Sequence, residues 1–252
     1  MTKMIFNSNK RPDSEAFAQK VSQKIKGWYA EDAYHDRAVE RIVHQREEMC
    51  SLLEKVEKVS VNQLLKYLDS SGFFYRPSAP NRHHNFPGGL AEHSLGVYRI
   101  VEEWNNMTPD ERRQSELYNR FLQDKDDVSC DILTEKMNTD DMIIASICHD
   151  LCKADHYYFD GRIIKRHHRN PDESGHSWVS KKRLEDNGIK GAECEELLLA
   201  VQNHMKLFSH TTNLTDAVTR KRGRASMLAI AVWAADKADA AAHPAGKLHR
   251  EL

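Results

Sequence analysis

Apolar residues recur at three- and four-residue spacing along most of the chain, with charged residues between them. This spacing puts the apolar side chains on one face of an α-helix, so it predicts a largely helical protein. Residues 13–59 are typical, with Phe17, Val21 and Ile25 in the first half. The helices predicted from the pattern span about 13–59, 61–71, with a cap at Ser60, then 90–104, 139–153, 174–187, 193–208 and 225–242.

The helix that begins near residue 139 is the most informative of these. Either Asn138 or Thr139 can cap this helix, and the two aspartates that follow suit the positive end of the helix dipole. Its inward stripe is Ile143, Ile144, Ile147 and Leu151. His149 and Asp150 lie off that stripe, so core packing does not account for them.

Three segments depart from the helical pattern. Residues 73–89 are rich in Pro, Gly and Asn and predict a loop, while the polar stretch 105–138 predicts at most one irregular helix, around Leu117–Leu122. Asp160-Gly161 stands between two short runs of aromatic and β-branched residues, which predicts a small β-hairpin, the one sheet expected. A boundary near Arg76 divides the chain into an N-terminal helical extension, 1–75, and a main domain, 76–252.

Composition narrows the class of protein. A chain of 252 residues can bury a core without cross-links, and its five cysteines include no Cys-x-x-Cys pair. No signal-peptide run precedes residue 17, and no apolar stretch reaches the roughly 20 residues that span a bilayer. We therefore expect a cytoplasmic protein without a membrane segment. The 37 Lys and Arg nearly balance the 38 Asp and Glu, so net charge does not mark a nucleic-acid binder.

Histidine is the unusual component. Fourteen are present, many of them in 83–93, 149–176 and 204–210, which directs attention to a metal or acid–base site. His149-Asp150 offers an imidazole nitrogen and a carboxylate oxygen, although such a pair alone is common on helix surfaces. His93 upstream and Asp236 downstream favour a metal site over a chance surface pair. Asp236 stands among alanines, and an aspartate buried in such surroundings needs a partner such as a cation.

The order of a histidine, a His-Asp pair and a distant aspartate resembles the HD superfamily of metal-dependent phosphohydrolases. The similarity extends to Arg82-His83-His84, to Gly88–Ser94 and to Cys148–Lys153, which matches a His-Asp-hydrophobic-small-Lys pattern. In motif it is closest to the HD domains of bacterial 3′–5′ exoribonucleases and of some conjugative relaxases. The resemblance covers about residues 80 to 243 and implies an all-α HD-domain helical bundle with the one hairpin.

The resemblance also implies the ligands. One divalent ion would be held by His93, His149, Asp150 and Asp236, with Asp150 bridging to a second ion bound by His176 and His204. Nitrogen and oxygen ligands suit one or two ions of Mn, Fe, Co, Ni or Zn. Such ions generate hydroxide at neutral pH for attack on the phosphorus of an ester.

Lys153 and Asp150 are the first candidates for catalytic roles. Lys153, four residues after His149 on the predicted helix, can hold a phosphate oxygen as a point charge. The alternative is a surface ion pair with Asp150 or Asp155. Cys148 and Cys152 flank the His-Asp pair, and their spacing beside the apolar stripe favours buried small hydrophobes over metal ligands.

Basic residues elsewhere are candidates for substrate binding. Arg82 and His83 lie just ahead of the metal-bearing helix, and His84 is the candidate proton donor to the leaving group, although one of the three would serve only to pack or cap the loop. The cluster 220–224, with Arg222 and Arg224, suits a polynucleotide backbone, or else it is a solvated loop. Arg166–Arg169 is explained equally well as a solvated face or a substrate contact.

The sequence thus favours a metal-dependent phosphohydrolase that cleaves a phosphate ester of a nucleotide or nucleic acid, of the phosphodiesterase or nuclease type. A nucleotide monophosphatase is one alternative. The other is a metal-retaining HD module that acts by binding, with residues 1–75 as the docking surface for a partner. A homo-oligomer is compatible with either.

Overall fold

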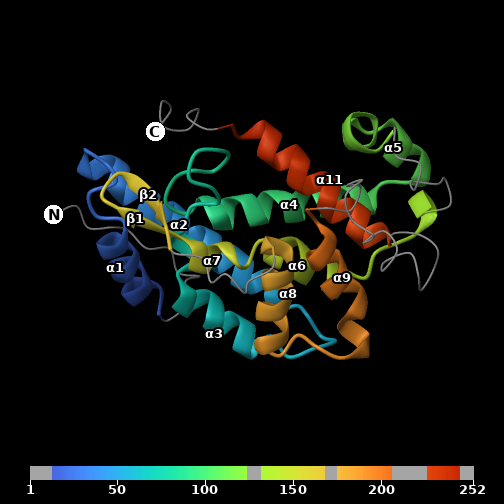
Figure 1. The fold of residues 1–252 in the computed structure, drawn as a ribbon, viewed down its shortest axis with the longest axis horizontal. Helices are drawn as coiled ribbons and strands as arrows, with labels where there is room; N and C mark the ends of the chain where they lie inside the picture. Colours follow the sequence, from blue (N-terminus) through green and yellow to red (C-terminus); the bar gives the residue numbers. More distant parts are fainter. Residues whose placement is uncertain (1–12, 124–131, 168–174, 206–225, 245–252) are drawn as a thin grey trace.

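The computed structural model describes residues 13–123, 132–167, 175–205 and 226–244. Over these residues the chain is a bundle of α-helices with one two-stranded antiparallel sheet (Figure 1), which confirms the predicted fold class. The longer helices are α1 (Ser14–Lys24), α2 (Asp32–Leu53), α3 (Asn62–Ser71), α4 (Gly89–Asn106), α6 (Thr139–Cys148), α8 (His176–Asp186), α9 (Glu195–Asn203) and α11 (Met227–Ala242). The shorter elements are α5 (Pro109–Gln114), α7 (Lys153–His156), β1 (Tyr157–Asp160) and β2 (Ile163–Arg166).

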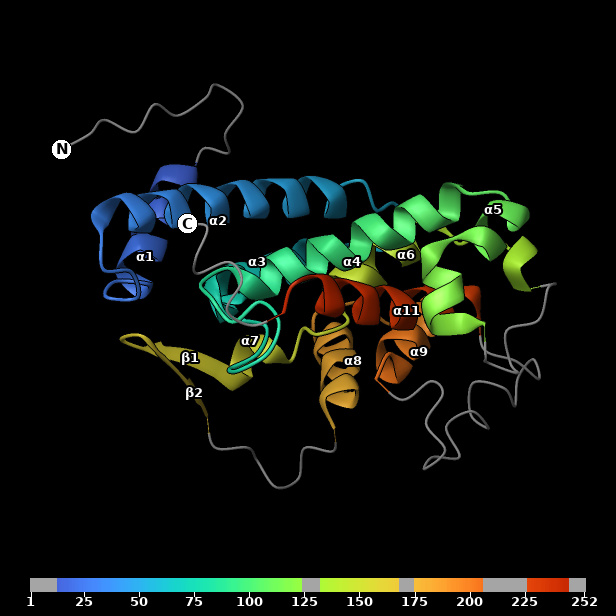
Figure 2. The same cartoon turned by 90° about the horizontal axis from the view of Figure 1, so that it is seen from above.

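Helix α4 runs through the middle of the bundle. In Figure 2, α2 lies along one side of α4 and α11 along the other, with α8 and α9 beyond α11. Helix α6 also packs against α4. Leu90, Leu95 and Val101 of α4 are all buried, so this helix has the apolar surface that contact on several sides requires. Side chains from α4, α6 and α11 are therefore brought together in the centre of the molecule.

The predicted helix over residues 13–59 is two helices, α1 and α2, and this part of the prediction is wrong. Gly27, between them, has a φ of +83°, which non-glycine residues rarely adopt, and α1 packs back against α2. Ile25 and Trp28 on either side of the turn are both buried, so the apolar pattern continues through it. The glycine was the one feature of the sequence here that could have indicated the break between the two helices.

Arg46 joins the three N-terminal helices. Its side chain is only 2% exposed and donates to Asp13 Oδ2 at 2.6 Å and to Asp69 Oδ1 at 2.7 Å. Hydrogen bonding to Asp69 raises the pKa of Arg46 despite its burial, so the guanidinium stays charged. Asp13 directly precedes α1 and Asp69 lies on α3, and thus one cation on α2 contacts both neighbouring elements.

A single hydrophobic core crosses the predicted boundary near Arg76. Leu53 and Leu68 from the N-terminal segment belong to the same buried cluster as Leu90 and Ile144 from the main domain. Helix α2 contacts both α4 and α6. The N-terminal helices pack as a layer on the rest of the described chain, and the division into 1–75 and 76–252 stays a prediction.

Helix α6 begins as predicted and ends early. The Asn138 side chain accepts a hydrogen bond from the Asp141 amide at 3.1 Å and so caps the helix. The helix ends at Cys148, and residues 149–152 form turns before α7 begins at Lys153. Lys153 therefore does not follow His149 on one continuous helix, contrary to the prediction.

The β-hairpin is confirmed. Tyr157 lies opposite Arg166 and Asp160 opposite Ile163, with Gly161 at a φ of +58° in the turn. Helix α3 is also present, but it follows Val61 without a side-chain cap, so Ser60 does not have the predicted capping role.

The polar stretch after α4 is more ordered than predicted over its described residues. It contains α5 in addition to a π-helical turn, Tyr118–Leu122, which matches the one irregular helix expected. Arg112 of α5 is 1% exposed and donates to the carbonyl oxygens of Trp104, Asn105, Leu133 and Glu135. It thereby ties the C-terminal end of α4 to a distant segment. Among the described helices, none combines the length and apolar character needed to cross a membrane.

Candidate metal centre

Four predicted ligands meet at the centre of the bundle. His93 comes from α4, His149 and Asp150 from the turn that follows α6, and Asp236 from α11, and all four are buried. His93 Nε2 lies 3.1 Å from His149 Nε2, 3.2 Å from Asp236 Oδ1 and 3.6 Å from Asp150 Oδ2. Ligand atoms about 2.1 Å from one ion are about 3.0–3.4 Å apart. Two of these distances fall in that range and the third is slightly longer, and the four ligand atoms are grouped closely enough to surround one ion.

Hydrogen bonds orient the two imidazoles. His149 Nδ1 donates to the Ser146 carbonyl at 2.8 Å, which leaves Nε2 as the nitrogen with a free lone pair. His93 Nδ1 lies 2.6 Å from Asp239 Oδ2, a distance at which the ring N–H donates to the carboxylate. Both Nε2 atoms are thus directed at the same point.

Asp239 is a residue of the site that sequence reasoning missed. Its carboxylate is 3% exposed and contacts His93 from the side away from the other ligands. The signal was its position three residues after Asp236, which puts both carboxylates on one face of α11. A methyl group at Gly96 of α4 would lie 2.1 Å from Asp239 Oδ1, so only glycine allows this close approach of α11 to α4.

Asp150 presents its two oxygens to two different sets of neighbours. Oδ2 faces His93 and His149, while Oδ1 lies 3.5 Å from His204 Nε2. His204 Nδ1 donates to the Val201 carbonyl at 2.7 Å, so its Nε2 is also oriented inward. Among the described residues, neither Asp150 Oδ1 nor His204 Nε2 has a hydrogen-bond partner, although both atoms are buried. Buried polar atoms left in this state fit a bound cation.

The charges at the centre respond to each other strongly. Burial opposes protonation of His93, but hydrogen bonds to Asp150, Asp236 and Asp239 outweigh it and raise the pKa of His93 to about 10. Burial also opposes ionisation of Asp150, yet the Lys153 ammonium beside it holds the pKa of that carboxyl well below its usual range. Several carboxylates around one imidazole thus create a site that favours positive charge.

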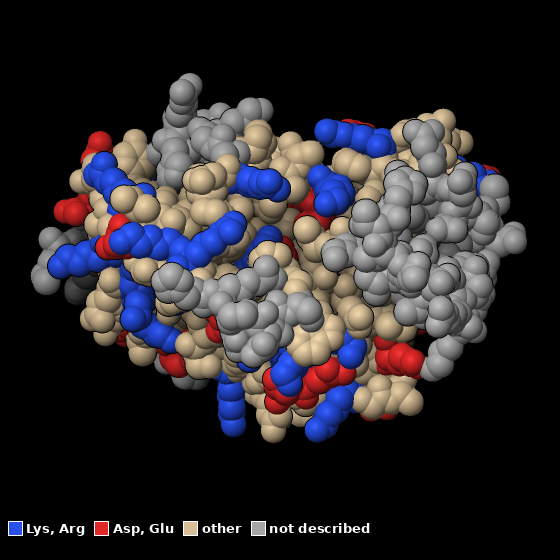
Figure 3. All heavy atoms as spheres, viewed as in Figure 1, with Lys and Arg blue, Asp and Glu red and all other residues tan. Residues whose placement is uncertain are grey.

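A cavity of about 440 Å³ leads to this centre, and Asp150 and Asp236 line it. Four basic side chains line it as well: Arg82, Lys153, Arg166 and Lys237. In Figure 3, lysine and arginine side chains gather over the part of the surface that carries the hairpin. Arg82 and Lys153 were predicted as substrate-binding residues, whereas Lys237 was not predicted. For Arg166 the sequence left two interpretations open, a solvated face or a substrate contact.

Lys153 both pairs with Asp150 and reaches the cavity. Its ammonium forms an ion pair with Asp150 and donates to Ser78 Oγ at 3.3 Å. The ion pair with Asp150 that was considered as an alternative is therefore present. It is not on the surface, however, because the Asp150 side chain is only 2% exposed and the pair lies at the base of the cavity.

His83 and His84 take different positions. His83 lines the cavity, and its ring lies 4.8 Å from that of His93. His84 is buried, has a φ of +51° and lies 3.7 Å from Asp239 instead. Burial, followed by the proximity of His93, lowers the pKa of His83 to about 3 and that of His84 to about 2. His83 is the one of the two that a substrate in the cavity can reach.

One other predicted ligand, His176, lies apart from the four-ligand cluster. His176 Nδ1 is 3.7 Å from Cys152 Sγ, and these two group with His156. Cys148 is buried in the hydrophobic core as predicted, whereas Cys152 is buried beside imidazole nitrogen. Arg222 and Arg224 lie outside the described residues.

Comparison with known proteins identifies the family. The sequence model of the HD domain matches residues 90–242, a range that contains all six predicted ligands and more than half of the chain. No curated protein and no solved structure gives a significant match. Similarity to exoribonucleases and relaxases in particular stays a prediction. The chain belongs to the HD domain family.

Proposed function

We propose that this protein hydrolyses a phosphate ester of a nucleotide or nucleic acid with the help of a divalent transition-metal ion. The observation that carries the proposal is the cluster of His93, His149, Asp150 and Asp236 at the base of a cavity lined with basic side chains. Neutral imidazoles and carboxylates bind the ion, and cations outside them attract a phosphate.

The four residues would hold the ion, and Asp150 together with His204 would hold a second one, a role that their closeness supports. When bound, the ion activates water for attack on phosphorus and withdraws charge from the phosphoryl oxygens. Asp239 keeps His93 in the orientation and tautomer that binding requires.

The basic side chains of the cavity would bind the phosphate. Lys153 can exchange its contact with Asp150 for a phosphate oxygen, because an ion beside Asp150 would neutralise that carboxylate. Arg82, which is exposed at the rim, can bind a phosphate in a bidentate manner. His83 would donate a hydrogen bond to the leaving oxygen, whereas the sequence alone made His84 the candidate proton donor to the leaving group. The predicted phosphate contacts of Arg222 and Arg224 remain part of this proposal.

A second cavity favours a nucleotide over a simple phosphate ester. It measures about 590 Å³, and it shares Pro80 and Asn81 with the first cavity. Its walls include the aromatic side chains Trp28, Tyr29 and Tyr34, with Arg162 opposite in the turn of the hairpin. Aromatic rings bind bases by stacking, worth roughly 1–3 kcal/mol per base. A base could occupy this cavity while its phosphate lies at the metal centre.

The test uses the purified full-length chain, loaded with Mn²⁺ or Fe²⁺ and assayed on oligonucleotides, cyclic nucleotides and nucleoside monophosphates. We expect diester hydrolysis that disappears in Asp150→Ala together with bound metal, but not in Asp186→Asn, a control on the exposed side of α8. Hydrolysis of monophosphates alone would favour the monophosphatase. Metal binding without turnover of any of these would leave the binding module, and full activity in Asp150→Ala would refute the site.

The role of the aromatic cavity can be tested separately. Tyr34→Ala should lower kcat/KM roughly tenfold for an oligonucleotide, in line with the loss of one stacking contact. The same variant should not affect an oligonucleotide that carries an abasic residue at the cleaved position. Equal effects on both substrates would mean that Tyr34 acts on the fold and not on the base.

A further inference from the structure

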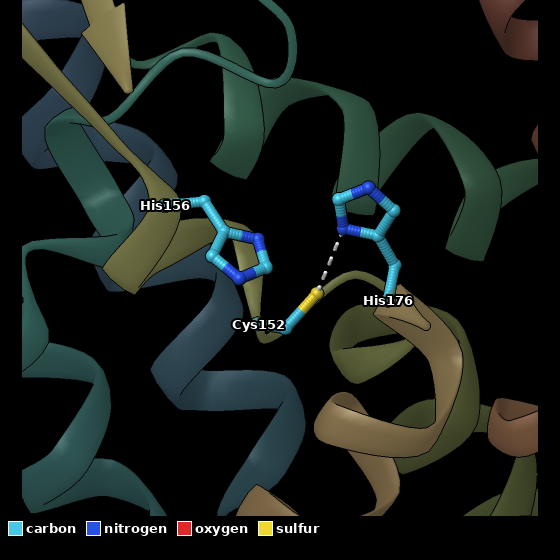
Figure 4. Close-up of side chains that lie close together, drawn as sticks. All are labelled: Cys152, His156 and His176. Atoms are coloured by element: carbon cyan, nitrogen blue, oxygen red, sulfur yellow. Dashed lines mark hydrogen bonds between the residues drawn. The ribbon is translucent and has the colours of Figure 1, made fainter. Parts of the chain in front are cut away.

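A second group of metal-binding side chains lies beside the first and contains the one type of ligand that the HD motif does not use. It consists of Cys152, in the turn after α6, His156, at the end of α7, and His176, the first residue of α8. One ligand atom from each lies within 4.8 Å of the others. In Figure 4 the cysteine sulfur lies between the two imidazole rings, which approach it from opposite sides.

The distances fit a tetrahedral ion. Cys152 Sγ and His176 Nδ1 are 3.7 Å apart. An ion about 2.3 Å from sulfur and about 2.0 Å from nitrogen, with a tetrahedral angle between them, separates the two ligand atoms by about 3.5 Å. The ring centroids of His156 and His176 are 5.1 Å apart at an angle of 73°, so both rings can direct a nitrogen at the same point.

The surrounding structure holds the cysteine in place without the ion. The Cys152 amide donates to Ser180 Oγ at 3.1 Å, one helical turn after His176 on α8. Two contacts along the same helix, Ser180 with the backbone and His176 with the sulfur, thus fix the position of Cys152. The side chain of Cys152 is fully buried, whereas both histidines are partly exposed and His176 lines the cavity.

A reactive thiol explains the cluster less well. The side chain of Cys152 is fully buried, whereas nucleophilic and redox-active cysteines are usually partly exposed to solvent.

We propose that Cys152, His156 and His176 bind a Zn²⁺ ion at a site separate from the four-ligand HD centre. The thiol proton leaves to solvent when the ion binds, and a fourth position is left for water or a substrate oxygen. Thiolate selects Zn²⁺ over the harder Mn²⁺, so the two centres would take different metals. Bound zinc would also fasten the start of α8 to the end of α7 and so fix one wall of the cavity. His176 would then bind this zinc ion and not the second ion of the HD centre that its position in the motif implies.

Cobalt is a suitable probe, because thiolate-bound Co²⁺ has an intense charge-transfer absorption in the near ultraviolet and Co²⁺ bound only by nitrogen and oxygen does not. The reduced, chelator-treated full-length protein is titrated with Co²⁺ and then with Zn²⁺. We expect the band to form, to disappear as zinc displaces cobalt, to be absent in Cys152→Ser and to remain in Cys194→Ala, a control at another buried cysteine.

No band in the wild-type protein would overturn the proposal and leave the sulfur as a hydrogen-bond partner of His176 alone. A band that persists in Cys152→Ser would overturn it as well, because the thiolate would then belong to another cysteine. Should Cys152→Ser fail to fold, His156→Gln gives the same comparison, with a lost or shifted band expected. None of these measurements uses phosphoester hydrolysis, so failure here is distinguishable from failure of the proposed function.

Discussion

Replacing Asp239 with asparagine removes one negative charge from behind the metal centre and hardly changes the shape of the side chain. Asp239 Oδ2 lies 2.6 Å from His93 Nδ1 and is not among the cluster that would hold the ion. An asparagine oxygen can still accept the hydrogen bond, so the orientation of the ring survives and the charge is lost. Asp239→Ala removes both.

The expected loss follows from what such carboxylates contribute. Removing a hydrogen-bonded partner of a ligating histidine weakens metal binding by about 10- to 100-fold, or about 1.4–2.8 kcal/mol. In the metal-free protein the same carboxylate also stabilises a proton on His93, whose pKa is raised to about 10. This proton competes with the metal ion for His93. Losing the carboxylate therefore weakens proton binding as well as metal binding, and the two effects partly offset each other. We therefore expect about tenfold for asparagine and close to 100-fold for alanine.

Metal affinity is measured by competition with a chromophoric chelator, and the thermal unfolding of the metal-free variants shows whether the fold is retained. Asp186→Asn, in an exposed i,i+4 pair with Lys182, is the matched control and should bind metal as the wild type does. Unchanged affinity in both Asp239 variants would refute the assignment of Asp239 to the metal centre. Equal losses in the two would show that the charge of Asp239 matters and that the hydrogen bond retained by asparagine does not.

Three further substitutions test the packing around the site. Gly96→Ala should destabilise the protein by about 1–3 kcal/mol and weaken metal binding, because its methyl group would displace Asp239; a variant with unchanged melting temperature and affinity would contradict the close approach. Arg112→Met removes four charge-assisted hydrogen bonds and should cost about 3 kcal/mol in urea unfolding, so an unaltered midpoint would refute the role of Arg112 at the end of α4. Burial, with a neighbouring carboxylate, raises the pKa of Tyr67, so the folded state keeps the phenol proton that the unfolded chain releases near pH 10, and stability should fall as pH rises above that value. Tyr67→Phe should lose about 1 kcal/mol at neutral pH but show a smaller alkaline fall in melting temperature; an identical fall would exclude Tyr67 as its source.

The sequence predicts those parts of the site that the order of the motif and the apolar pattern mark together. His93, His149, Asp150 and Asp236 are each marked by a helical apolar pattern and by the order of the motif, and the structure brings them together. The helical periodicity predicts the bundle, and the Asp-Gly pair between two short apolar runs predicts the hairpin.

The remainder depends on contacts between distant segments. Asp239 acquires its role because α11 crosses α4 at Gly96, and no spacing within either helix reveals that crossing. Likewise, four-residue spacing made Cys148 and Cys152 equivalent, but only Cys152 meets a histidine, because α8 returns to the turn after α6. The break at Gly27 was hidden by apolar residues that continue through it.

The early end of α6 at Cys148 also determines which kinds of mutation the protein can accept near its centre. In an uninterrupted helix, residues 149 and 152 would share a face, and the turn separates them so that His149 faces the metal centre and Cys152 faces α8. Lys153, one residue on, reaches the cavity. Inserting or deleting one residue between Cys148 and Lys153 would therefore misplace several functional groups in a single event, whereas substitutions alter them one at a time. A mutant library directed at this segment should vary residue identity and keep its length fixed.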